Sequence, residues 1–227
     1  MSRVVPMDCV DYVSCGNGQD VYDVKNNVHR LMPMLRKEEV KDIIAPMDRH
    51  LVVMSVHGNG VFRRFAHPSK AWYGCLVMAV RLMAAVALRR RWMIWKIETD
   101  YGFLKDMEPA KICFSGTHLS LKRYLSDLEP DKYSHSFVNP YWLEMQSKGV
   151  SKGNAVQWIQ LREGISREET ACAGDGENDL SMMEHCAIRI VPANAMKSVK
   201  AIATEHVTCW KKEGVPHWLE EHLLEEE

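Results

Sequence analysis

The chain of 227 residues has 46% hydrophobic and 26% charged residues, which is typical of a globular protein. Its 29 basic and 30 acidic residues leave a formal net charge of −1, which argues against a general nucleic-acid-binding surface. The seven cysteines form no Cys-x-x-Cys motif and the ten histidines no His-x-x-x-His pair, so we expect reduced thiols in a cytoplasmic protein and no zinc site.

The first predicted elements are short strands at 10–15 and from Val21, separated by Gly16-Asn17-Gly18. An Asn-Gly pair between apolar runs favours a hairpin because both residues tolerate a positive φ. A third short strand is expected at 28–31, before Pro33. The spacing of Val40, Ile43, Ile44 and Met47 then predicts a helix over 37–47. Strands at 51–56 and 61–65, around a turn at 57–60, predict a second hairpin.

Residues 71–88 are almost entirely apolar, with Arg81 inside and three arginines following at 89–91. A membrane helix needs about 20 apolar residues. A central arginine would cost about 2.5–3.5 kcal/mol in a bilayer. We therefore favour a buried helix of a globular domain over a membrane span. A third reading is that residues 69–95, dense in Arg, Trp and Met, are not authentic domain sequence. Beyond them, strands at 111–114 and 133–138 flank a helix at 118–128, and a turn at 139–142 leads into a further strand at 143–145.

Two stretches in the last third of the chain combine glycines with charged side chains. Lys152 opens a helix between Gly149 and Gly153, where free N–H groups and the helix dipole favour an anion. The alternative is an exposed lysine beside a Ser151 cap. The second stretch, at 170–183, reads as a buried strand that ends in Gly-Asp-Gly and turns directly into a helix.

The acidic pair of that second stretch, Asp175 and Asp179, lies at the carboxyl end of the strand, where open α/β sheets bind ligands. Two carboxylates beside glycines suit Mg²⁺, although a turn followed by a capped helix would read the same way. A strand at 187–191, a helix at 194–203, a strand at 206–208 and a closing helix with Val215, Trp218 and Leu219 follow. This alternation predicts a parallel sheet covered by helices.

The order GVSKGNA, helix, strand, GDGEND closely resembles the third and fourth motifs of the haloacid dehalogenase (HAD) superfamily, in particular its Cof-type sugar-phosphate phosphatases. The resemblance is strong over 111–224, weaker over 11–62 and not found over 63–100. It implies an α/β fold with a HAD-like Rossmannoid core and a parallel sheet, plus an inserted α+β cap. The core would comprise residues 1–34 and 147–227, and the cap residues 35–146.

Roles for individual residues follow from the resemblance alone. It implies that Asp175 holds Mg²⁺ and that Asp179 either holds it too or orients its waters and Lys152. It also implies that Lys152 neutralises the phosphoryl oxygens and the nucleophile. The implied sets are Lys152, Asp175 and Asp179 for catalysis, Asn17, Lys152 and Asn194 for substrate binding, and Gly174, Gly176 and Asn178 for the loop. Asn17 reads equally well as a plain turn residue. Gly58, Asn59, Asn139 and Glu144 are weaker candidates for substrate contact.

The resemblance also exposes a gap, because these enzymes carry an Asp-x-Asp nucleophile motif that this sequence lacks. Residues 10–23 match the third core strand, so we expect an N-terminally incomplete core. The expected function is Mg²⁺-dependent hydrolysis of sugar phosphates or other small phosphorylated metabolites, with the chain as given inactive. The alternative is a non-catalytic phosphate-binding, metal-binding or interaction protein. Neither a nucleic acid nor a membrane is an expected partner, and the oligomeric state is not predicted.

Overall fold

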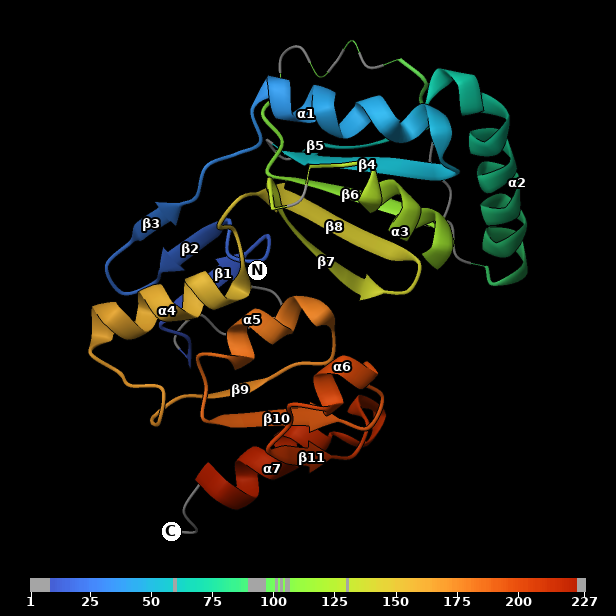
Figure 1. The fold of residues 1–227 in the computed structure, drawn as a ribbon. Helices are drawn as coiled ribbons and strands as arrows, with labels where there is room; N and C mark the ends of the chain where they lie inside the picture. The colour runs from blue at the N-terminus through green and yellow to red at the C-terminus, as the bar shows by residue number, and fades with distance from the viewer. Residues whose placement is uncertain are drawn as a thin grey trace. The chain divides into compact units, whose positions relative to one another are not determined.

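The computed structural model describes residues 9–58, 61–89, 97–100, 102, 104, 107–129 and 131–223. The chain divides into two compact units, which are described separately (Figure 1). Unit 1 contains residues 1–32, 137–139 and 149–227, and unit 2 contains residues 33–136 and 140–148.

The first sheet of unit 1 is antiparallel and has the order β1-β2-β3. Its strands are β1 (Tyr12–Cys15), β2 (Asp20–Asp23) and β3 (Val28–Leu31). Tyr12 pairs with Asp23 and Cys15 with Asp20, which confirms the predicted hairpin. Three consecutive residues of its turn, Gly16, Asn17 and Gly18, have φ values of 59°, 58° and 93°. Glycine and asparagine adopt this left-handed conformation more readily than other residues, which explains the local sequence.

The second sheet of unit 1 is parallel, with the order β11-β10-β9, as the alternation of elements predicts. Helices α4 (Lys152–Glu163), α5 (Leu180–Met183), α6 (Lys197–Lys200) and α7 (Gly214–Leu223) belong to this part of the chain. The strands are β9 (Ala171–Ala173), β10 (Ile188–Pro192) and β11 (Glu205–Val207). Its apolar core consists of Met183, Val191, Ala195 and Val199.

Two details of this sheet differ from the sequence prediction. Strand β9 is an edge strand with Ala171 and Ala173 exposed, not a buried strand. The helix expected over 194–203 is reduced to α6, because Met196 adopts an extended conformation. The side chain of Asn194 is engaged elsewhere, where its Oδ1 accepts a hydrogen bond from the backbone N–H of Trp210 at 3.3 Å.

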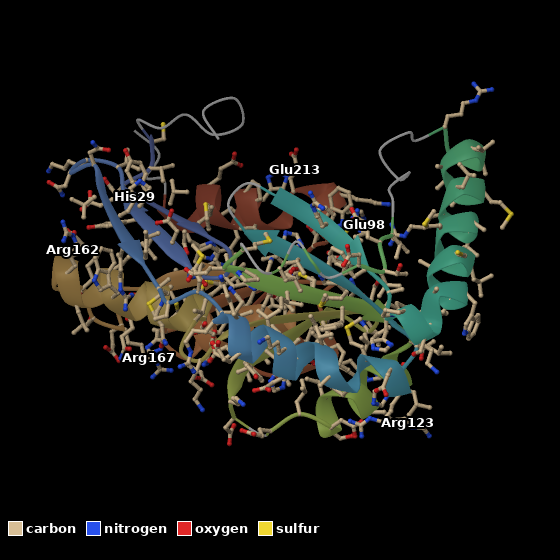
Figure 2. All side chains as sticks on the ribbon, turned by 90° about the horizontal axis from the view of Figure 1, so that it is seen from above. His29, Glu98, Arg123, Arg162, Arg167 and Glu213 are labelled. Carbon is tan, nitrogen blue, oxygen red and sulfur yellow. The ribbon has the colours of Figure 1, made fainter. Side chains whose placement is uncertain are left out.

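A buried aspartate joins helix α4 to the antiparallel sheet of unit 1. The Asp23 carboxylate accepts hydrogen bonds from the backbone and side chain of Asn26, at 2.9 and 2.8 Å, and from the Arg162 guanidinium at 2.7 Å. These hydrogen bonds lower the pKa of Asp23, and the two from Asn26 have the largest effect. In Figure 2, Arg162 lies on α4 and His29 on the neighbouring sheet. This network holds the helix that begins with Lys152.

Unit 2 is built on a five-stranded sheet with the order β5-β4-β6-β8-β7 (Figure 1). Strand β6 is antiparallel to both β4 and β8, and β4 is antiparallel to β5. The strands are β4 (Val52–Gly58), β5 (Val61–Phe65), β6 (Lys111–Gly116), β7 (Tyr133–Asn139) and β8 (Trp142–Ser147). The sequence predicts all five strands; the turn at 59–60, with the candidate Asn59, lies outside the described residues.

Helices α1 (Lys37–Ile44) and α3 (His118–Ser126) supply part of the core of unit 2. The ring of Tyr124 on α3 is fully buried against Phe114 of β6, with ring centroids 4.4 Å apart. Its hydroxyl donates a hydrogen bond to the carbonyl of Ile43 at 2.6 Å, so one side chain connects both helices to the sheet. Helix α1 ends three residues before the predicted Met47 because Pro46 follows in a 3-10 turn at 45–49.

Helix α2 (Ala71–Ala87) forms where the apolar run predicts a helix, but the expectation that it is buried is wrong. Only Gly74 and Ala85 are buried, and Figure 2 shows side chains projecting from several sides of it. Among the described residues, one helical segment, Pro68–Ala87, is long and apolar enough to cross a membrane, and 11% of its 18-residue apolar window is buried. Large apolar side chains are exposed along it: Trp72, Leu76, Val80, Leu82, Met83 and Val86.

A histidine in β4 should make the stability of unit 2 depend on pH. Burial, followed by the positive charge of Lys111, lowers the pKa of His57 from 6.5 to about 4. The ring Nε2 is buried and has no hydrogen-bond partner among the described residues. In the unfolded chain the ring binds a proton near pH 6.5, whereas in the folded chain it stays neutral until about pH 4. The contribution of His57 to the stability of unit 2 should therefore be fully present above pH 6.5 and be lost as the pH drops towards 4.

We expect His57 to contribute about 1–2 kcal/mol to this acid-dependent loss, allowing for partial solvent screening. Urea unfolding at pH 7.5 and pH 5.0 measures it. The difference between the two pH values should be smaller in His57→Gln than in the parent and in His135→Gln, which removes an exposed histidine of β7. Equal differences in parent and His57→Gln would show that His57 does not titrate as stated.

Candidate functional site

The loop that follows β9 is folded around the side chain of Asp179. This carboxylate is 4% exposed, and its Oδ2 accepts the backbone N–H groups of Asp175 and Gly176 at 2.9 and 3.0 Å. A Cβ atom at Gly174 would lie 2.6 Å from the Asp179 side chain, so only glycine leaves room for it. The carboxylate therefore closes the acidic loop, residues 174–179, on itself.

The lysine predicted to meet an anion contacts this loop directly. Lys152 is the first residue of α4, whose N-terminus is capped by the Ser151 Oγ accepting the Asn154 N–H at 3.1 Å. Its Nζ lies 2.5 Å from Oδ1 of Asp179, and its side chain is 33% exposed. Asp179 thus uses one oxygen for the loop and the other for Lys152. The ammonium group stays partly open to solvent, where a ligand could reach it.

Ser181 makes a contact that the sequence does not predict. Its Oγ accepts the backbone N–H of Gly153 at 3.2 Å, which joins the first turn of α4 to α5. A side chain at Gly153 would collide with the Ser181 carbonyl, so the glycine lets the two helices approach. The only signal in the sequence is that both residues are small.

The hairpin turn of the first sheet also reaches the acidic loop. The side-chain amide of Asn178 donates a hydrogen bond to Oδ1 of Asn17 at 3.3 Å. Asn17 therefore lies beside the loop and not only in a turn. The two residues are 161 positions apart in sequence, so this contact depends on the fold of unit 1.

The two remaining candidates of unit 1 are exposed. Asp175 makes no side-chain hydrogen bond to another described residue, and its backbone carbonyl accepts the N–H of Met196 at 2.9 Å. Its carboxylate is thus available to a ligand. Asn194 bonds to the N–H of Trp210, and no described contact brings it to Lys152 or Asp179.

The acidic loop and the first residue of α4 together offer two carboxylates and one ammonium group. No group of three or more His, Cys, Asp and Glu side chains able to hold a metal ion occurs in the part of the chain that the structure describes. Mg²⁺ does not require such a group, because it is usually held by one or two carboxylates plus waters and phosphate oxygens. The exposed Asp175 carboxylate fits that role, with Asp179 already committed to Lys152.

The weaker candidates in the five-stranded sheet have different surroundings. Glu144 in β8 is buried and forms an ion pair with Lys111 at 2.8 Å, and its Oε1 also accepts the Trp142 Nε1–H at 3.4 Å. Gly58 and Asn139 are the last residues of β4 and β7.

Unit 2 also holds an open cavity of ≈ 700 Å³. Residues of α1 line it, together with Thr99, Asp100, Gly102 and Leu104 among others. None of the predicted site residues lines it.

Comparison with known proteins shows the family to which the chain belongs. Residues 2–219 match the family of haloacid dehalogenase-like hydrolases, so the chain belongs to that family. Among curated relatives, it is 29% identical over 106 residues to the Bacillus subtilis 5-amino-6-(5-phospho-D-ribitylamino)uracil phosphatase YitU, covering 46% of this chain and 39% of YitU. It is 37% identical over 82 residues to a phosphoglycolate phosphatase of Methanopyrus kandleri, covering 36% of this chain and 35% of the relative.

Solved structures show the same fold. The HAD subclass IIB sugar phosphatase BT4131 superposes with a TM-score of 0.74 at 19% identity, over 97% of this chain and 78% of that one. A haloacid dehalogenase-like hydrolase from B. subtilis gives a TM-score of 0.72 at 18% identity, over 98% and 83% of the two chains. The matched segment spans less than half the length of the curated relatives. The α/β fold expected from the sequence is thereby confirmed.

Proposed function

We propose that the chain carries the phosphate- and Mg²⁺-binding half of a phosphomonoester hydrolase that acts on sugar phosphates or other small phosphorylated metabolites. The observation that carries the proposal is the Lys152–Asp179 ion pair beside the exposed Asp175 carboxylate. The named phosphatases among the relatives support the reaction class. In this proposal unit 1 is the core, unit 2 is the cap, and the protein is cytoplasmic.

Each residue of the site has a distinct role in the proposal. Lys152 binds the phosphoryl oxygens through its partly exposed ammonium group and is oriented by Asp179. Asp175 holds Mg²⁺, which would supply positive charge to the phosphoryl group when bound. The hydrogen bond between Asn178 and Asn17 supports the loop from the side of the hairpin turn. In this proposal Asn17 also contacts substrate.

Hydrolysis also needs a nucleophile, and the sequence contains no Asp-x-Asp motif. We therefore expect the chain as given to bind Mg²⁺ and phosphate without turning over a phosphate ester at a normal enzyme rate. The second candidate function, a non-catalytic protein that binds phosphate or metal, predicts the same binding. Hydrolysis of p-nitrophenyl phosphate by this chain, lost in Asp175→Asn, would contradict the expected inactivity.

The role of Lys152 is tested by replacing it with methionine, which keeps the length of the side chain and removes its charge. Binding of inorganic phosphate in the presence of Mg²⁺, followed by calorimetry, should weaken tenfold or more, since a hydrogen bond to a charged group contributes about 1.5–3 kcal/mol.

Lys197→Met is the matched control, because it removes an exposed lysine of unit 1 outside the loop. Thermal unfolding of each variant checks that it is folded. Equal phosphate binding by the parent and a folded Lys152→Met variant would exclude the proposed anion site.

A further inference from the structure

Helix α2 presents apolar side chains to solvent, which is the reverse of what a surface helix of a globular protein shows. Its exposed residues recur at intervals of three and four positions and therefore occupy one half of the helix circumference. The remaining exposed residues of this half are Cys75 and alanines, so no charged side chain interrupts it. We call its six large side chains the apolar stripe: Trp72, Leu76, Val80, Leu82, Met83 and Val86.

The other half of α2 attaches the helix to unit 2. A Cβ atom at Gly74 would lie 2.9 Å from the Cβ of Ala66, so the helix approaches the end of β5 closely. The sulfur of Met78 accepts the backbone N–H of Ile97 at 3.3 Å. Arg81, the single charged residue of α2, is half-buried on this inner half. The apolar stripe is therefore exposed while the helix is docked.

Basic residues surround the apolar stripe, and the same stretch of sequence contains no acidic residue. None of the 30 acidic residues lies between Asp48 and Glu98, whereas nine lysines and arginines do. Lys70 is the N-cap residue of α2, and Arg89 follows its last turn and is exposed. The surface is thus apolar along its middle and basic at both ends, although the whole chain has a net charge of −1.

We propose that the apolar stripe is a docking surface for an anionic lipid membrane, with α2 lying in the plane of the membrane surface and Lys70 and Arg89 beside the lipid headgroups. A helix bound in this way buries its apolar side by about 5–10 Å and gains affinity from anionic lipids. The proposal concerns unit 2 and is independent of the proposed function. It departs from the expectation that a membrane is not a partner, because that expectation depended on a buried α2.

A helix that spans the membrane accounts for these observations less well. Spanning would place Arg81 in the hydrocarbon region, where a charged side chain is costly. It would also require α2 to leave its contacts with Ala66 and Ile97. Docking through the apolar stripe keeps these contacts and leaves Arg81 on the side of the protein.

A second copy of the chain is also a poorer partner for the apolar stripe. Pairing two stripes would bring the basic ends of both helices together, in either orientation, because α2 has Lys70 at one end and Arg89 at the other. Like charges placed opposite each other oppose association. An anionic membrane offers the opposite charge together with an apolar interior.

Flotation of the full-length chain with lipid vesicles in a sucrose gradient tests the proposal, because bound protein floats and aggregated protein sediments. Vesicles of phosphatidylcholine with about 30% phosphatidylserine should carry the chain upwards. Binding to vesicles of phosphatidylcholine alone should be at least tenfold weaker. Binding to the anionic vesicles should also weaken in about 0.5 M NaCl, since salt screens the attraction between exposed charges.

Variants at exposed positions separate the apolar and the basic contributions. Met83→Glu places a carboxylate in the apolar stripe and should weaken binding to the anionic vesicles tenfold or more. Leu119→Glu makes the same kind of change at an exposed position of α3 and should bind like the parent. Arg89→Gln should weaken binding about fivefold. Arg123→Gln removes an exposed arginine of α3 and should leave binding unchanged (Figure 2).

Thermal unfolding checks that each variant is folded. If the folded parent did not float with the anionic vesicles, the proposal would be overturned. Equal flotation with neutral and anionic vesicles that persists in high salt would also overturn it, and would point to a spanning helix. A dimer that Met83→Glu dissociates, seen by sedimentation equilibrium without any flotation of the parent, would assign the apolar stripe to a second copy instead.

Discussion

Replacing Asp179 by alanine is expected to lower the free energy of unfolding of unit 1 by about 2–4 kcal/mol and to abolish Mg²⁺-dependent phosphate binding. The carboxylate is 4% exposed and accepts the N–H groups of Asp175 and Gly176 while it pairs with Lys152. Each buried donor left without an acceptor costs about 1–3 kcal/mol. The lysine would also lose the group that orients it.

Urea unfolding followed by far-UV circular dichroism measures the loss for Asp179. Glu184→Ala is the matched control, since it removes an exposed carboxylate just after α5 and should change stability by less than about 0.5 kcal/mol. If Asp179→Ala were as stable as Glu184→Ala, the carboxylate would not be closing the loop.

The second large effect is expected at Tyr124 in unit 2. Replacement by alanine should cost about 3–5 kcal/mol, because a fully buried ring in contact with Phe114 is lost and leaves a cavity. Tyr124→Phe keeps the ring and removes only the hydrogen bond to the Ile43 carbonyl, so it should cost about 1 kcal/mol.

The comparison between the two Tyr124 variants separates packing from hydrogen bonding. Leu119→Ala, on the same helix but 59% exposed, serves as the control and should be nearly neutral. Chemical denaturation of the three variants gives the differences. A loss at Tyr124→Phe as large as that at Tyr124→Ala would assign the stabilisation to the hydroxyl and contradict the packing account.

Local sequence patterns predict most elements of this fold. The turn at Asn17 and the parallel sheet follow from turn chemistry and from the alternation of strands and helices. Such patterns report the conformation of a segment, but not which neighbour covers it. The apolar composition of α2 therefore predicts a helix correctly and its burial wrongly. The position of β9 at an edge depends likewise on strand order, which three residues do not encode.

The candidate site shows the same division. Glycines and charges at 149–153 and 174–179 indicate a lysine and a pair of carboxylates, and the structure brings Lys152 to Asp179. The contacts of Ser181 with Gly153 and of Asn17 with Asn178 join segments that are remote in sequence, so no local pattern contains them. For Asn194, the family resemblance predicts a contact with substrate. In the structure its side chain accepts a hydrogen bond from the Trp210 N–H, which the sequence does not indicate.

The central claim, that the acidic loop binds Mg²⁺ through Asp175, is tested most directly by calorimetric titration of Mg²⁺ into the reduced chain and its Asp175→Asn variant. Asp175 is exposed and its carboxylate bonds to no other described side chain or backbone group, so the variant should keep the unfolding midpoint of the parent. The account predicts saturable binding to the parent that is at least tenfold weaker in the variant. Equal binding by both chains, or none by either, would contradict it.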